Sequence, residues 1–530
     1  MLSLSEQKRP GGGAWPAALL ADRVLQRNII RHPPDPASCG DHPRVTNRGQ
    51  SAPDMPEPAS SPAPSGEAPN GEAPSGAPRP TRTPLAERLA RATHAIGRLS
   101  AEHIETRATA ATATRATLPP LPGLLSVGDR LQVIGRDGSA VPAQVTGSTA
   151  QDTTVTLFRD ATGLGAGAPV RMPIRPAAAT LPIGPGWIGR VVDPLGQPLD
   201  GRGALPLGQP QPVRRAPPPA ATRARIGPAV TLGVRAMDLF TTCRDGQRMG
   251  LFAGPGVGKS TLLGMLARWS DFDAIVVALV GERGREVREF LEDDLGPQGR
   301  QRALLFVATA DATALMRAEA VHAAMAAAEH FRDRGQRVLL LVDSLTRFCH
   351  AVREVALSAG ELPVARGYPP SVFADLASLL ERAGPGEERE GAPTGSITAF
   401  FTVLVDGDDL TEPVADAVRG IVDGHVILSR QIAERGRYPA IDVPRSLSRV
   451  ATAWHAPERN ETLRLARQAM AEAEELEQLS RMGLYRSGAD AHSDRMLTLN
   501  RLVTEFLRQD TRTPADPEEG FAQLARIVAG

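Results

Sequence analysis

The sequence predicts an α/β core built on a parallel sheet, preceded by a small β-domain and followed by a helical domain. Three observations support this prediction. Apolar runs of strand length alternate with helical segments from about residue 184 to 448, as in βαβ units whose strands are covered on both faces. Short alternating segments with Gly and Asp turns come before this region, from about residue 124. Helical periodicity without strand signals follows after residue 456.

Residues 1–84 are not expected to fold on their own. Prolines recur every few residues in 51–84, and residues 65–78 form a degenerate five-residue repeat, SGEAPNGEAPSGAP. Such a segment buries too little apolar surface to offset its conformational entropy, so we expect a disordered Pro/Gly/Ala-rich extension. A short amphipathic docking helix in 15–30 is one alternative for its first part. A true start at Met55 is another, which mass spectrometry of the N-terminus would test.

The remaining domains follow from changes in periodicity. Residues 85–181 are expected to hold one helix (85–99) and then an antiparallel β-domain, read as a small barrel. Its expected strands lie in 129–134, 142–145 and 153–158. Residues 182–448 form the expected α/β domain, with buried strands in 274–280, 303–307, 338–342 and 397–404 and a helix in 311–334. Residues 449–530 form the helical domain, with helices in 458–482, 494–507 and 517–528.

A glycine-rich loop within residues 250–261, GLFAGPGVGKST, is the most informative motif. An apolar run enters this loop, and Lys259 and Ser260 open a helical segment. Glycines let backbone N–H groups turn toward an anion, and the helix N-terminus adds its positive end. We expect Lys259 to reach the β- and γ-phosphates of ATP and the Ser260 hydroxyl to bind Mg²⁺. The expected nucleotide-binding residues are Gly254, Pro255, Gly256, Val257, Gly258, Lys259, Ser260 and Thr261.

Two further strand ends supply carboxylates to the same site. Asp343 follows the apolar run 338–342, where a carboxylate beside the phosphate-binding loop holds Mg²⁺. Glu282 follows the run 274–280, and the carboxyl ends of parallel strands are where α/β sheets place ligand loops. We expect Glu282 to orient and deprotonate the attacking water, with Glu286 as the alternative base. Arg283 is expected to meet the γ-phosphate or pair with a carboxylate.

Composition narrows the classes of function. The formal net charge is +0, which gives no global basic field for nucleic acid. Cys39, Cys243 and Cys349 are scattered, form no metal-binding spacing and suit a reducing compartment. No uncharged apolar run approaches the roughly 18 residues of a membrane span, and the N-terminus lacks an apolar signal core. The sequence therefore favours a cytoplasmic protein without a nucleic-acid partner.

Several longer motifs resemble the ATPase family of rotary ATP synthase catalytic subunits and type III secretion ATPases. The shared motifs are GERGREV (281–287), DSLTRF (343–348), ARGYPP (365–370), YPAID (438–442) and SLSR (446–449). Further stretches favour the export branch, and within it the flagellar export ATPases, with the virulence-type homologues close behind. These stretches are LGVRAMDLFTTC (232–243), GLFAG (250–254), GSITAF (395–400), DDLTEP (408–413) and EELEQLSRMGLY (474–485). The resemblance covers about residue 124 to the C-terminus.

The resemblance implies a RecA-like ATPase core and a role for each matching residue. It implies that Lys259 binds the phosphates and that Ser260 and Asp343 hold Mg²⁺. It also implies that Glu282 activates the attacking water. Arg283 and Arg347 match arginines of the site, and Tyr438 matches the tyrosine that stacks on adenine, a role that suits an aromatic face. Arg449 matches the arginine finger that a neighbouring subunit inserts to neutralise charge in the transition state.

The resemblance also implies ATP hydrolysis that energises type III protein export by a homohexamer. The implied partners are a stator or regulator protein at the N-terminal region, a coiled-coil stalk in the central pore, and substrates and chaperones at the C-terminal domain. The implied location is the cytoplasm, peripherally at the inner membrane beside the export gate.

Three other functions stay open from the sequence. A catalytic subunit of a rotary ATP synthase would use the same chemistry, although the export-type motifs argue against it. A hexameric nucleic-acid translocase would want basic and aromatic residues in the β-domain, where Phe158 is the only aromatic residue in 124–181. A purely structural nucleotide-binding subunit would not need a carboxylate base at Glu282.

Overall fold

The computed structural model describes residues 103–161, 163–173, 179–388, 390–391, 393–405, 410–451, 455–486 and 488–530. The chain divides into two units, residues 1–85 and 86–530, and every described residue belongs to the second. The predicted disordered extension, the predicted helix in 85–99 and the motif residues Asp408 and Asp409 lie outside the described residues. Among the helices that the structure describes, none is long and apolar enough to cross a membrane.

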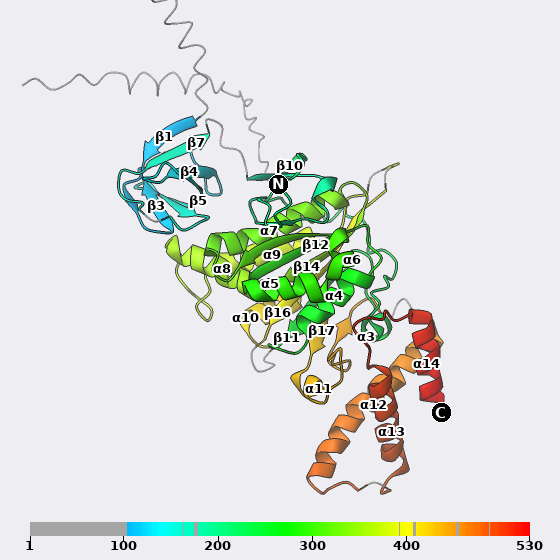
Figure 1. The fold of residues 1–530 in the computed structure, drawn as a ribbon. Coiled ribbons are helices and arrows are strands. Elements are labelled where there is room, and N and C mark those ends of the chain that lie inside the picture. Colours follow the sequence, from blue (N-terminus) through cyan, green and yellow to red (C-terminus); the bar gives the residue numbers. More distant parts are fainter. Residues whose placement is uncertain are drawn as a thin grey trace, which may run out of the picture. The chain divides into compact units, whose positions relative to one another are not determined.

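The first described strands form the small antiparallel β-domain that the sequence predicts (Figure 1). The strand order is β1-β7-β4-β5-β6-β3-β2, so the two edge strands, β1 and β2, are consecutive in the chain. The sheet forms a half-barrel around one apolar cluster. The strands are β1 (His103–Arg107), β2 (Ala110–Ala111), β3 (Arg115–Leu118), β4 (Arg130–Ile134), β5 (Ala140–Ser148), β6 (Thr153–Leu157) and β7 (Pro169–Pro173). No strand was expected at β1 to β3 or at β7. For β1 to β3 the reason is that the alanines and threonines of 103–118 give the alternation little hydrophobic contrast.

A nine-stranded sheet forms the centre of the molecule and confirms the predicted parallel α/β core. The order is β18-β17-β11-β16-β14-β12-β13-β9, with β15 paired to β16. The pairs among β9, β11, β12, β13, β14, β16 and β17 are parallel, whereas β15 and β18 pair antiparallel. The bounds are β9 (Val191–Val192), β11 (Arg248–Ala253), β12 (Ala274–Glu282), β13 (Ala303–Thr309), β14 (Arg337–Asp343), β15 (Gly384–Pro385), β16 (Ser396–Leu404), β17 (Gly424–Leu428) and β18 (Leu447–Ser448). A separate two-stranded sheet joins β8 (Thr180–Ile183) and β10 (Gln209–Pro212).

Helices bury both faces of the central sheet, which explains why its strands are continuous apolar runs. On β12, Val276, Ala278 and Val280 belong to one core cluster, while the alternate residues belong to the other. The first cluster includes residues of α7 (Ala314–Arg332), α8 (Leu345–Ser358), α9 (Pro370–Arg382) and α10 (Pro413–Ile421). The second includes residues of α3 (Arg235–Phe240), α4 (Lys259–Trp269), α5 (Gly284–Glu289) and the one-turn π-helix Phe290–Asp294. The helix α6 (Gly296–Arg302) contacts this π-helix.

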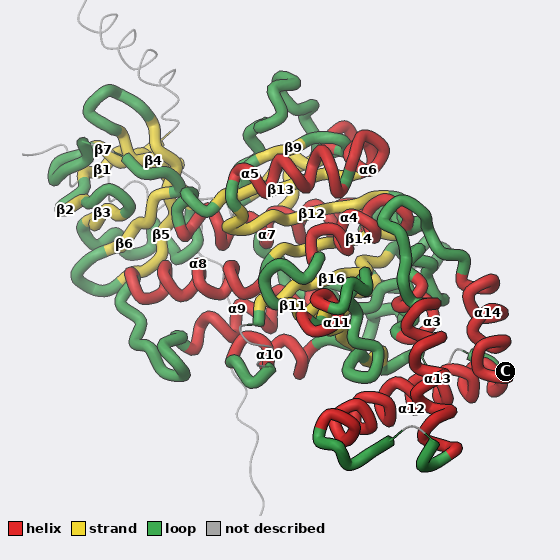
Figure 2. Tube along the Cα trace, turned by 60° about the horizontal axis from the view of Figure 1, so that its bottom comes forward, coloured by secondary structure: helices red, strands yellow, loops and turns green. Residues whose placement is uncertain are grey.

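The C-terminal segment is helical, as predicted. Its helices are α12 (Pro457–Arg481), α13 (Ala491–Phe506) and α14 (Pro517–Ala529), and the short α11 (Arg430–Glu434) precedes them. Figure 2 shows α12 and α13 side by side, with α14 near α3. Leu463, Val503 and Leu524 of these helices join the core cluster of α3 and α4, so the helical segment packs onto the α/β core. The boundaries at residues 84, 181 and 448 stay predictions.

Candidate active site

The predicted phosphate-binding loop starts at Gly254, directly after β11, and continues through Thr261 into the first turn of α4, which begins at Lys259. Gly256 has φ of 76° and Gly258 has φ of 91°, backbone conformations that glycine adopts without steric cost. Gly258 is also the N-cap of α4, so the loop delivers its backbone directly to a helix N-terminus. Pro255 and Gly256 are exposed, whereas Val257 is buried and anchors the loop.

Lys259, Glu282 and Asp343 meet at one edge of the sheet, as the sequence predicts. Glu282 is the last residue of β12 and Asp343 the last residue of β14, which pair in parallel. The Lys259 ammonium contacts Asp343 Oδ1, and its Nζ lies 3.5 Å from Glu282 Oε1. All three side chains are largely buried, so charge attraction between them is weakly screened. The lysine therefore lies between two carboxylates, where it can exchange them for phosphate oxygens.

Asp343 has a second partner that sequence reasoning missed. Thr402 lies on β16, the strand beside β14, and its hydroxyl donates to Asp343 Oδ1 at 2.9 Å. Both residues are buried. A threonine within an apolar strand carries no signal for this role, because the lateral order of strands decides which residue faces Asp343.

Arg347, near the start of α8, holds the loop that carries Glu282. Its Nη1 donates to the Gly281 carbonyl at 2.7 Å and lies 2.7 Å from Glu282 Oε1. Gly281 has φ of 68°, and a Cβ there would lie 2.9 Å from Arg347 Cδ, so only glycine fits beneath this arginine. The resemblance implies that Arg347 is an arginine of the nucleotide site, and the structure adds this contact with the expected base.

The two glutamates of the GERGREV motif interact. A hydrogen bond with Glu282, together with the charges of Arg283 and Arg347, holds the pKa of Glu286 below its usual value. Glu286 Oε1 also lies 3.3 Å from Arg283 Nη1, and the Arg283 side chain is 81% exposed. The alternative base is thus a neighbour of Glu282, and Arg283 has room to reach a ligand.

Tyr438 lies against the phosphate-binding loop. Its ring carbons Cδ1 and Cε1 lie 3.6 and 3.7 Å from the position that a Cβ would take on Gly258. The side chain is half-exposed. The Tyr438 carbonyl accepts a hydrogen bond from Gln509 N at 3.0 Å, and the Gln509 side chain bonds the Gly233 carbonyl and Arg235 N. Gln509, which follows α13 and which the sequence reading missed, therefore ties the Tyr438 loop to α3.

Thr261 of the loop also has a partner that the sequence did not indicate. It forms a side-chain hydrogen bond with Asp294 at the end of the π-helical turn, and burial raises the pKa of Asp294 above its usual value despite this bond. The contact joins the first turn of α4 to the segment after α5.

Arg449 does not join this constellation within the chain. Its backbone N donates to the Asp423 carbonyl at 3.1 Å, just before β17, whose Gly424 pairs with Met249. Met249 lies at the start of β11, whereas Lys259 follows its end. The six residues of β11 span roughly 20 Å. Arg449 is exposed and lies near the amino-terminal end of β11, whereas Lys259, Glu282 and Asp343 lie at the carboxyl ends of the strands.

Comparison with known proteins agrees with this architecture. Residues 233–448 match the ATP synthase alpha/beta family nucleotide-binding domain, and residues 456–526 match the T3SS EscN ATPase C-terminal domain. The chain is 47% identical over 406 residues to a flagellum-specific ATP synthase of Caulobacter vibrioides, covering 76% of this chain and 91% of that protein. It is 45% identical over 386 residues to the SPI-2 type 3 secretion system ATPase of Salmonella typhimurium, covering 73% of this chain and 87% of that protein.

A solved structure shares the fold. The assembled ATPase EscN in complex with its central stalk EscO, from the enteropathogenic E. coli type III secretion system, superposes with a TM-score of 0.70 at 36% identity. The match covers 80% of this chain and 99% of that one. Sequence and fold agree, and the chain belongs to the ATP synthase alpha/beta family, in the branch of flagellum-specific ATP synthases and type 3 secretion system ATPases.

Proposed function

We propose that this export ATPase hydrolyses ATP as a homohexamer in the apparatus that exports flagellar proteins. The observation that carries the proposal is the separation of Arg449 from Lys259, Glu282 and Asp343 across the sheet. A ring in which one protomer presents Arg449 to the loop edge of the next would complete each site. The assembled state of the related EscN supports a ring.

The phosphate-binding loop would hold the ATP phosphates through its backbone N–H groups and Lys259. In doing so, the Lys259 ammonium would leave its contacts with Asp343 and Glu282 for phosphate oxygens. The Ser260 hydroxyl and the Asp343 carboxylate are oxygen donors of the kind that Mg²⁺ takes, and Asp343 already contacts one cation, Lys259. When bound, Mg²⁺ supplies charge neutralisation at the β- and γ-phosphate oxygens.

Glu282 is the proposed general base. Arg347 Nη1 lies 2.7 Å and Lys259 Nζ 3.5 Å from the same carboxylate oxygen, Glu282 Oε1. Once phosphate draws Lys259 away, the Glu282 carboxylate would orient a water in line with the γ-phosphorus and accept its proton. Arg283, exposed beside it, would contact the γ-phosphate.

Two residues would complete the site. The half-exposed Tyr438 ring borders the loop at Gly258 and offers an aromatic face for adenine. Arg449 of the adjacent protomer would neutralise charge that develops in the transition state, an effect worth ~10³–10⁵ in rate for such fingers.

The proposed partners follow the family. A central stalk is supported by the EscN–EscO complex, and we extend it to this chain. We also propose a stator or regulator at the N-terminal region, substrates and chaperones at the helical C-terminal segment, and a cytoplasmic place at the inner membrane beside the export gate. A virulence-type system is the second candidate, since the SPI-2 ATPase is 45% identical. Deletion of the gene would decide between them by the loss of flagella or of effector secretion.

The Glu282→Gln variant tests the hydrolytic role. We expect it to bind a fluorescent ATP analogue as the wild type does and to lose ~10²–10⁴ in turnover. Steady-state ATPase activity and equilibrium binding would be measured on the same preparation. Turnover close to that of the wild type would remove Glu282 from its role. A rate per subunit that did not rise with protein concentration would contradict the requirement for a ring.

A further inference from the structure

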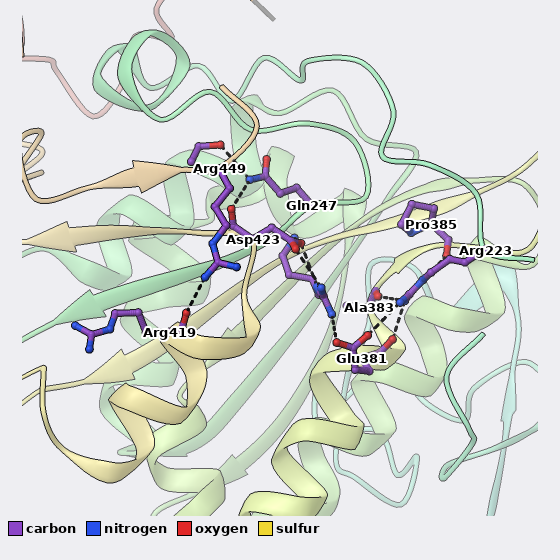
Figure 3. A network of polar contacts seen from close by, with 10 residues as sticks. Arg223, Gln247, Glu381, Ala383, Pro385, Arg419, Asp423 and Arg449 are labelled. Carbon is purple, nitrogen blue, oxygen red and sulfur yellow. Dashed lines mark hydrogen bonds and ion pairs between the residues drawn. The ribbon is translucent and has the colours of Figure 1, made fainter. Parts of the chain in front are cut away.

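A polar network surrounds the base of Arg449 (Figure 3). We define the finger clamp as Gln247, Arg248, Asp423 and Ser448. Gln247 and Arg248 enter β11, Asp423 precedes β17, and Ser448 ends β18 directly before Arg449. Three strand ends therefore converge on the residue proposed to act in the neighbouring site.

Asp423 is the member of the finger clamp that touches Arg449 itself. Its carbonyl accepts from Arg449 N at 3.1 Å. Its carboxylate accepts from Arg248 N at 3.0 Å, from Arg248 Nε at 3.1 Å and from Arg248 Nη2 at 3.1 Å. The Asp423 backbone N donates in return to the Arg248 carbonyl at 2.9 Å. Charge-assisted bonds of this bidentate kind are strong and directional, so they fix the Asp423 carbonyl in place.

Gln247 fixes the residue before Arg449. Its fully buried side chain donates through Nε2 to Ser448 Oγ at 3.0 Å and lies 3.4 Å from the Asp423 carbonyl. Ser448 Oγ donates in turn to the Thr242 carbonyl at 2.9 Å. Since β18 has only two residues, these side-chain bonds replace the ladder that a longer strand would provide.

The finger clamp is anchored on the helical layer as well. Arg248 Nη1 lies 2.6 Å from Glu381 Oε1 on α9, and Arg223 Nη1 lies 3.2 Å from Glu381 Oε2. Arg449 Nη2 reaches the Arg419 carbonyl on α10 at 3.5 Å. The backbone of Arg449 is thus held by this network, while its guanidinium makes one long contact among the described residues and can be redirected.

We propose that Asp423, held by Arg248, is a positioning residue for Arg449, and that it sets the turnover of the neighbouring site rather than nucleotide binding in its own. This inference rests on the proposed trans-acting role of Arg449. A flexible arginine contributes little unless its base is fixed, because a displacement near 1 Å can cost about 10²-fold in rate.

The test is a double-mutant cycle in the full chain with Asp423→Asn, Arg449→Ala and both together. Each is assayed for kcat, KM for ATP, thermal unfolding and ring assembly by sedimentation, at concentrations where the wild type is assembled. We expect Asp423→Asn to lower kcat about 10- to 100-fold with KM nearly unchanged. The double variant should be no slower than Arg449→Ala alone, because nothing is left to position. Glu461→Gln, which loses an exposed α12 contact with Arg464, is the matched control and should keep the wild-type kcat.

The outcomes separate this inference from the proposed function. If Arg449→Ala is slow but Asp423→Asn is not, or if the two losses multiply in the double variant, Asp423 does not act through Arg449 and the inference fails alone. If assembled Arg449→Ala rings keep the wild-type kcat, the finger role fails and the inference falls with it. Should Asp423→Asn not fold, Glu381→Gln weakens the partly exposed anchor that Arg248 shares with Arg223 and leaves Asp423 in place. A smaller kcat loss that disappears in the Arg449→Ala background would support the inference, and an unchanged kcat would overturn it.

Discussion

Arg347 and Glu282 share one short contact that also fixes the backbone between them. Arg347 Nη1 lies 2.7 Å from Glu282 Oε1 and donates at 2.7 Å to the carbonyl of Gly281, the residue before. One guanidinium nitrogen thereby sets both the path of the loop and the position of the proposed base. Its place in the first turn of α8, directly after Asp343, links the two carboxylates of the site through a rigid element.

We expect Arg347→Lys to lower kcat about 10²-fold while ATP still binds. Lysine keeps the charge, but its side chain is one bond shorter than the path to Arg347 Nη1, so its ammonium cannot reach both acceptors in the same geometry. Steady-state kinetics and nucleotide binding would be measured together. Arg288→Lys is the matched control, since Arg288 pairs with Glu292 at 2.9 Å and its side chain is 77% exposed. A kcat within about twofold of the wild type in Arg347→Lys would contradict the positioning role.

We expect Thr402→Val to raise the Mg²⁺ concentration for half-maximal ATPase activity about 10- to 100-fold, as the loss of an outer partner of a metal ligand commonly does. The hydroxyl donates to Asp343 Oδ1 at 2.9 Å, and valine has nearly the same shape without the donor. The measurement is a Mg²⁺ titration at fixed ATP.

The control for this prediction is Thr156→Val in the β-domain. Thr156 is buried and its hydroxyl bonds to that of Thr146 at 2.9 Å, so the variant loses a comparable hydrogen bond away from the site. It should leave the Mg²⁺ titration unchanged. An identical shift in both variants would mean that lost stability, and not the link to Asp343, causes the effect.

The convergence of Lys259, Glu282 and Asp343 could be predicted because it depends only on local patterns. Each of the three follows an apolar run of strand length, and parallel strands bring their carboxyl ends to one edge. The C-terminal helices are likewise local, since period and caps define them. The positions of these residues and helices could therefore be predicted from the sequence immediately around them.

Thr402 and Gln509 could not be predicted, because their roles depend on which distant segments become neighbours. Thr402 faces Asp343 only because β16 lies beside β14, and Gln509 reaches Tyr438 only because the helical segment packs on α3. The strands β1 to β3 were not predicted for another reason. Their alanines and threonines differ too little in hydrophobicity to show an alternating pattern. The opposite placement of Arg449 and Lys259 also required the register of β17 on β11.

Burial raises the pKa of Asp238, on α3, to about 7, and hydrogen bonds from the 232–234 backbone only partly oppose this. Leu232 N donates to its Oδ1 at 2.8 Å, whereas Oδ2 is buried without a hydrogen-bond partner among the described residues. The folded state therefore binds this proton more tightly than the unfolded chain does. The resulting stability is full below about pH 4 and is lost as the pH rises through about 7. At ~1.4 kcal/mol per pKa unit, the loss is at most about 4 kcal/mol.

We therefore expect Asp238→Asn to gain stability relative to the wild type as the pH rises from about 5 to about 8. The neutral amide keeps an oxygen for Leu232 N and never becomes charged. Melting temperatures of both proteins at each pH measure this difference. Asp271→Asn, at a side chain that is 93% exposed, should show the same small difference at both values. If the difference in melting temperature between Asp238→Asn and the wild type were also constant across this range, the prediction would be wrong. Asp238 would then not change its protonation state between these pH values in the folded protein.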